Sequence, residues 1–132
     1  MNQEFYNIVE RICDKDPKYR PGAYEFVMEA LSYSQRKFKR IKHVTGTELL
    51  EGIKELLMIR FGHMALLVLN HWGIKNTEDF GNIVFNLVQE RILSKDNEDH
   101  IDSFRNGYDF QEVFDRGYRK ILEKRISRMR TH

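Results

Sequence analysis

The chain of 132 residues is poor in residues that cross-link or interrupt a polypeptide, with one cysteine and two prolines. A single cysteine, Cys13, excludes a disulfide within the chain and is typical of a reducing compartment. The longest uninterrupted apolar run, Met64–Leu69, is far shorter than the roughly 18 residues of a membrane helix. The amino-terminal residues lack the basic start and apolar stretch of a signal peptide. We therefore expect a cytoplasmic protein without integral membrane association.

The charge is nearly balanced overall but unevenly distributed. The chain has 22 lysines and arginines and 20 acidic residues, a net charge of +2. From Arg116 to His132, seven basic residues oppose only Glu123, a local net charge of +6, which leaves −4 for the rest. With 41% hydrophobic residues, the chain can bury a core without disulfides or metals. We expect one helical domain over residues 1–115 and a basic C-terminal helix or tail over 116–132.

Apolar residues recur mainly at helical spacing, which predicts a mainly α fold, a compact bundle of about five to six helices. Pro21 suits the first turn of one helix. Thr45 with Glu48 three residues later has the pattern of a capping box. Gly73 suits the left-handed position after a helix ending at Trp72. Thr77 is the expected N-cap of the next helix.

The pattern weakens after residue 92, and residues 93–108 have two readings. They can form a short helix, or a small β-hairpin turning at Asn106-Gly107. A hairpin at this place would make the domain resemble a winged helix.

The stretch WGIKNTEDFGNIVFNL, residues 72–87, contains a helix end, a short turn and a helix start. This is the shape of a DNA-reading helix-turn-helix, in which Asn82 and Asn86 could recognise adenine. However, Glu78 and Asp79 at the start of the second helix would repel phosphates. We therefore favour a packing corner between two core helices.

The same stretch carries a resemblance to known proteins. WGIKNTEDFGNIVFNLVQERIL, with HVTGTELLEGI before it and DSFRNGYDFQEVF after it, resembles a family of small uncharacterised bacterial proteins. The resemblance covers roughly residues 20–116. It implies one compact bacterial domain, but it implies no activity and transfers no catalytic residue.

No residue pattern assigns a reaction, a cofactor or a metal. Two helical turns separate His63 from His71, about 12 Å, which is too far for one ion. The acidic segment 96–102 does not match a calcium loop, because Ile101 stands where glycine is required. Asp14 and Asp16 should raise the pKa of the Cys13 thiol, which disfavours a nucleophile. A non-enzymatic binding module is therefore favoured over an enzyme.

The basic residues are the strongest functional signal, because in the tail they alternate with apolar residues as in a basic amphipathic helix. We expect RNA, the ribosome or another nucleoprotein as partner, bound by phosphate contact. The alternative is a protein partner or a homo-oligomer, with the basic residues serving only solubility. The candidate nucleic-acid-binding residues are Arg36, Lys37, Lys39, Arg40, Arg119, Lys120, Lys124, Arg125, Arg128 and Arg130.

Overall fold

A computed structural model describes residues 3–94 and 101–130, and in these residues every regular element is a helix. The α-helices are α1 (Gln3–Lys15), α2 (Pro21–Lys37), α3 (Gly46–Phe61), α4 (Ala65–Trp72), α5 (Thr77–Gln89) and α6 (Tyr118–Arg130). Shorter elements are the 3₁₀ helices η1 (Gly62–Met64) and η3 (Ile101–Phe104) and a π-helix, η4 (Gln111–Gly117). The predicted mainly α class is confirmed.

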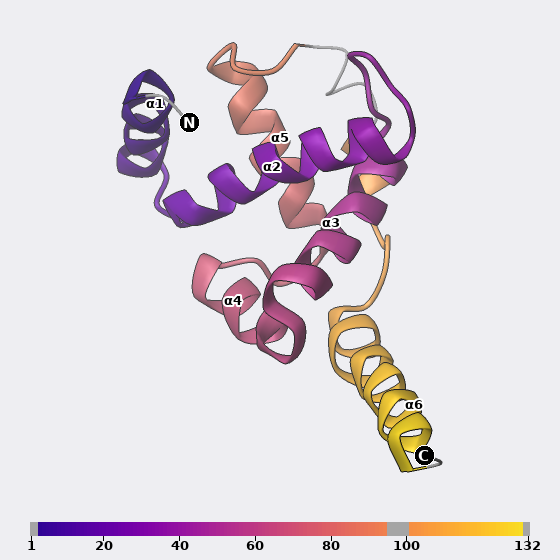
Figure 1. Ribbon diagram of the computed structural model, residues 1–132. Helices are drawn as coiled ribbons and strands as arrows, with labels where there is room; N and C mark the ends of the chain where they lie inside the picture. Colours follow the sequence, from indigo (N-terminus) through magenta and orange to yellow (C-terminus); the bar gives the residue numbers. More distant parts are fainter. Residues whose placement is uncertain (1–2, 95–100, 131–132) are drawn as a thin grey trace.

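Helix α2 is the centre of the fold, in contact with α1, α3, α4 and α5 (Figure 1). Pro21 occupies its first turn, as predicted. Tyr24, Val27 and Ala30 of this helix are completely buried. The core is completed by Ile53 and Leu57 of α3 and by the buried face of α5. Burying large apolar side chains such as these supplies most of the folding free energy.

The helix ends follow local sequence rules closely, with one exception. Thr45 and Glu48 form the predicted capping box at the start of α3. Gly73 ends α4 with a φ of 84°, the left-handed conformation expected there. The prediction that Thr77 caps α5 is wrong, because the cap is Asn76, whose side chain accepts from the N–H of Asp79. Thr77 is buried and instead donates its hydroxyl to the carbonyl of Phe104.

The hairpin alternative for residues 93–108 is wrong in the part that the structure describes, while residues 95–100 lie outside the described residues. No strand occurs in the described residues, and Ile101–Phe104 form the 3₁₀ helix η3. Asn106 does adopt a positive φ of 50°, so the turn signal is real. However, the ring of Phe104 is buried against Gly81 of α5. This single contact holds the segment on α5, without the alternating buried side chains of a hairpin. The winged-helix likeness therefore has no support.

The two asparagines that a helix-turn-helix of α4 and α5 would use to recognise adenine are hydrogen-bonded within the protein. Asn82 donates to the hydroxyl of Tyr19 at 3.0 Å, and Asn86 donates to the hydroxyl of Tyr24 at 2.9 Å. Asn82 is exposed and Asn86 half-buried, but the amide of each is hydrogen-bonded to a buried tyrosine. Among the described residues, none of the helices is both long enough and apolar enough to cross a bilayer.

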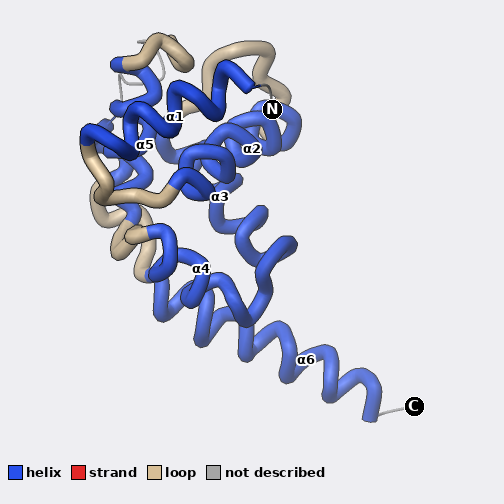
Figure 2. Tube along the Cα trace, turned by 90° about the vertical axis from the view of Figure 1, so that its left-hand side faces the viewer, coloured by secondary structure: helices blue, strands red, loops and turns tan. Residues whose placement is uncertain are grey.

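The last helix differs from the others in its surroundings. η4 packs on η1 and α4, and α6 continues from it (Figure 1). In two perpendicular views α6 runs away from the other helices, and its C-terminal end is the point farthest from them (Figure 2).

Candidate binding surfaces on and beside the last helix

Aromatic packing fixes the base of α6. Phe114 in η4 is only 2% exposed and packs against the rings of Tyr108 and Phe110. The Tyr108 hydroxyl donates to the carbonyl of Leu50 in α3 at 2.7 Å. Tyr118 lies over Gly62, where a β-carbon would come 3.5 Å from its ring. These contacts set the direction in which α6 extends from the body of the protein, by which we mean α1 to α5 and η4.

Beyond Tyr118 the basic side chains of α6 are exposed. Lys120, Lys124 and Arg128 follow one another every four residues, so they form a row on one helix face about 12 Å long. Arg119 is paired with Asp115 at 3.0 Å. Within the part of the chain that the structure describes, Lys120, Lys124 and Arg125 have no ion pair. The side chain of Arg130 lies outside what the structure describes.

The other face of α6 is apolar and also exposed. Leu122, Ile126 and Met129 are 41%, 40% and 74% exposed. Their spacing of four and three residues puts them on one stripe of the helix. The predicted basic amphipathic helix is therefore present, and its apolar stripe is largely uncovered by the described part of the protein.

The first basic cluster consists of Arg36, Lys37, Lys39 and Arg40 at and after the end of α2, and half of it is ion-paired. Lys37 is ion-paired with Glu55, and Arg40 is ion-paired with Glu48. Arg36 and Lys39 are exposed and form no ion pair among the described residues. Carboxylates of α3 therefore neutralise half of the four predicted binding residues of this cluster.

The two basic clusters do not form one surface. The turn after α2, which carries Lys39 and Arg40, lies at one end of the molecule, and the end of α6 lies at the other (Figures 1 and 2). A single ligand contacting both this turn and the end of α6 would have to extend along most of the protein. The end of α6 is therefore a separate candidate site from the turn after α2, and Lys120, Lys124 and Arg125 of α6 have no ion pair among the described residues.

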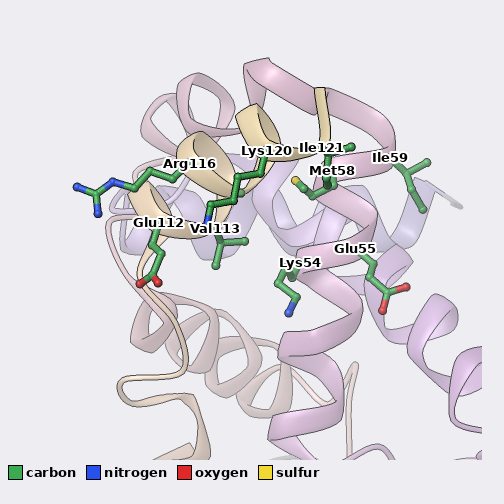
Figure 3. A pocket seen from close by; sticks show the side chains of 10 residues that line it. Lys54, Glu55, Met58, Ile59, Glu112, Val113, Arg116, Lys120 and Ile121 are labelled. Atoms are coloured by element: carbon green, nitrogen blue, oxygen red, sulfur yellow. The ribbon is translucent and has the colours of Figure 1, made fainter. Parts of the chain in front are cut away.

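A hollow of about 700 Å³ lies between α3 and the segment formed by η4 and the start of α6 (Figure 3). Its apolar wall consists of Met58, Ile59, Val113 and Ile121. Lys54, Glu55, Glu112, Arg116, Gly117 and Lys120 complete the lining. Val113 projects toward α3, whereas Arg116 extends outward from the helix (Figure 3). A volume of this size is typical of ligand and peptide sites.

The π-helix η4 supplies one side of the hollow. Glu112, Val113, Arg116 and Gly117 all belong to it. π-helical turns are rare and occur frequently at functional sites, because the wider turn costs stability. The location of η4 beside the hollow is consistent with a surface kept for binding.

The comparisons with known proteins do not assign this chain. No protein-family model, no curated protein and no solved structure matches it. The resemblance to a bacterial family stays a prediction, and the function has to be inferred from the surfaces themselves.

The hollow beside α6 was not predicted from the sequence, although one signal for it exists. The buried stripe of α3 is formed by Leu49, Ile53 and Leu57. Ile59 lies outside that stripe and is 68% exposed. The position of Ile59, an apolar residue away from the buried face of its helix, is thus the sequence signal that could have predicted the hollow.

The single cysteine has a structural environment. The Cys13 thiol is half-buried and donates to the carbonyl of Tyr19 at 3.5 Å. Burial, and then the neighbouring Asp14 and Asp16, raise the pKa of this thiol. A raised pKa leaves little thiolate at neutral pH, which is unfavourable for a nucleophile.

Proposed function

We propose that the protein is a non-enzymatic binding module that engages RNA or a nucleoprotein through α6. The observation that carries this proposal is the row of exposed residues Lys120, Lys124 and Arg128 along α6, whose C-terminal end points away from the other helices. Exposed lysines and arginines bind nucleic acid by displacing counterions from phosphates.

The chemistry of the row favours phosphate contact over base recognition. Between Tyr118 and Arg130 there is no asparagine or glutamine, the side chains best suited to reading adenine. Binding should therefore depend strongly on salt and weakly on base sequence.

The proposal is tested by the affinity for a single-stranded oligoribonucleotide, measured by fluorescence anisotropy at about 50 and 200 mM salt. The double variant Lys124→Glu with Arg128→Glu should bind at least about tenfold more weakly at the lower salt. Loss of two phosphate contacts should also reduce the slope of log K against log salt by about 1.4.

The matched control is the double variant Arg36→Glu with Lys39→Glu. It makes the same charge change in the other basic cluster, at exposed residues without ion pairs in the described chain. We expect it to bind within about threefold of the unchanged protein. Equal losses in both double variants would mean that net charge alone drives binding, and the proposal would be wrong.

A second candidate function is self-association through the apolar stripe of Leu122, Ile126 and Met129. The exposure of these three side chains favours it. The local charge of +6 opposes direct pairing of two α6 helices, so association should strengthen as salt rises. Sedimentation at low and high salt distinguishes it from nucleic-acid binding, which weakens with salt.

A further inference from the structure

A second hollow adjoins the first and shares part of its apolar lining. It has a volume of about 440 Å³ and lies between the end of α3 and the first turns of α6. Met58, Ile59 and Ile121 line both hollows. The two together form a trough, which we define by the linings of both hollows.

The dimensions of the trough suit a helix. On the side of η4 and α6 it extends from Glu112 to Arg125, roughly 20 Å at the rise of an α-helix. Three to four turns of a bound helix have this length. The wall residues Ile59 and Ile121 are 68% and 41% exposed, so the trough is an open surface rather than an enclosed cavity. Open apolar grooves of this kind receive the apolar face of an amphipathic helix.

The charges around the trough define the partner further. Lys54, Glu55 and Arg60 are already paired with Glu51, Lys37 and Glu29, respectively. Four other charged residues line the trough, and within the described chain they form no ion pair. They are Arg116, Lys120, Arg125 and Glu112. Three positive charges against one negative leave a surplus of +2.

We propose that the trough docks an acidic amphipathic helix of a partner protein. The apolar stripe of that helix covers Met58, Ile59 and Ile121, and its carboxylates face Lys120 and Arg125. Complementary charge of this kind speeds association and excludes wrong partners.

Two other occupants fit less well. A second copy of the chain would offer its exposed helix α6, where six basic residues against Glu123 give a charge of +5 that repels the surplus on the trough. RNA would have to dehydrate its phosphates over an apolar wall. An acidic amphipathic helix instead covers the apolar wall with its apolar side chains and pairs its carboxylates with Lys120 and Arg125.

The probe for the test is a synthetic peptide of about 18 residues, with leucines at helical i, i+3, i+4, i+7 spacing and glutamates beside them. A second peptide carries lysine in place of every glutamate. Binding is measured by anisotropy, and the site is mapped by amide shifts in ¹⁵N-labelled protein. We expect the glutamate peptide to shift residues of the trough and to bind at least about tenfold more tightly than the lysine peptide.

The variant that tests the wall is Ile59→Ser with Ile121→Ser, which should weaken the glutamate peptide about tenfold. Leu67→Ser on α4 is the matched control, because Leu67 is 60% exposed and lies outside the trough. It should bind within about twofold of the unchanged protein. Ile59→Ser alone, at the more exposed wall residue, should weaken binding about threefold and guards against misfolding of the double variant.

The two proposals fail separately. Lys124→Glu with Arg128→Glu should lose RNA but keep the peptide within about threefold, because neither residue lines the trough. Absence of peptide binding at about 1 mM would overturn the docking proposal. So would unchanged peptide binding by the Ile59/Ile121 variant, or shifts of the wall residues Met58, Ile59 and Ile121 by the oligoribonucleotide.

Discussion

The hydroxyl of Tyr19 donates to Oδ1 of Asp79 at 2.5 Å, and the two residues are 60 positions apart in the chain. Oδ2 of Asp79 accepts the backbone N–H groups of Lys75 at 2.7 Å and of Asn76 at 3.2 Å. Both side chains are buried. This carboxylate therefore ties the loop between α1 and α2 to the start of α5. Burial, and then this hydrogen bond, raise the pKa of the Tyr19 hydroxyl, which stays protonated at neutral pH.

Replacing Tyr19 with phenylalanine should destabilise the protein, because a buried carboxylate oxygen loses its neighbouring hydroxyl donor. We expect the free energy of unfolding to fall by about 1–3 kcal/mol, measured by urea denaturation. Tyr6→Phe is the matched control, since Tyr6 is exposed and its hydroxyl bonds to Glu25 at the surface. That change should cost less than about 0.5 kcal/mol. Similar losses in both variants would refute the structural role of the Tyr19–Asp79 bond.

Replacing Gly52 with alanine should be severe, because α2 and α3 touch there. A β-carbon on Gly52 would lie 1.8 Å from Oγ of Ser34. We expect a loss of about 2–3 kcal/mol in unfolding free energy from this overpacking. Ser34 Oγ is buried with no hydrogen-bond partner in the described structure, so Ser34→Ala alone should cost less than about 0.5 kcal/mol. The double variant should recover part of the loss, and strictly additive losses would contradict the contact.

Acid should weaken the protein partly through Glu48. A hydrogen bond from Arg40, and then one from the backbone N–H of Thr45, lower the pKa of Glu48 below its ordinary value of 4.5. A carboxyl group with a lowered pKa stabilises the fold at pH values above the ordinary pKa. That stability disappears as the pH falls through the lowered pKa.

The measurement is the unfolding free energy between about pH 6 and pH 3. Glu48→Gln keeps a capping side chain but should flatten the pH dependence over this range. Arg40→Gln should flatten it partly, because Arg40 is the largest cause of the shift. Arg36→Gln, in the same basic cluster but without an ion pair in the described chain, should leave the profile unchanged. If the unfolding free energy of Glu48→Gln still fell steeply at low pH, groups other than Glu48 would govern the acid sensitivity.

Ending the chain after Leu122 should leave the body folded. The removed segment includes Ile126 and Met129, which are 40% and 74% exposed and contribute little burial. We expect the unfolding free energy to change by less than about 1 kcal/mol and RNA affinity to be lost. A loss of several kcal/mol would show that the end of α6 packs on the body or on a second copy.

Local chemistry made some features predictable from the sequence. The capping box of Thr45 and Glu48, Pro21 in a first turn and left-handed Gly73 each depend on residues within one helical turn. Such features need no information about distant parts of the chain.

Other features failed because a distant residue decided them. Asn76 and Thr77 are both competent N-caps, and the carbonyl of Phe104 engages the hydroxyl of Thr77. The space beside Gly81 of α5 is taken by Phe104 of η3 rather than by Trp72. Trp72 instead lies over Gly22, where a β-carbon would come 2.7 Å from the indole nitrogen.

The candidate site divides in the same way. Periodicity alone identified the basic amphipathic character of residues 118–130, because charge and spacing are properties of one helix. Only the tertiary structure placed Glu48 and Glu55 of α3 beside the first basic cluster, whereas Lys120, Lys124 and Arg125 of α6 have no ion pair among the described residues. The trough likewise exists only because η4 and α3 meet across more than fifty residues of sequence. Helical pattern is set by neighbours along the chain, whereas charge pairing and the shape of a surface are set by neighbours in space.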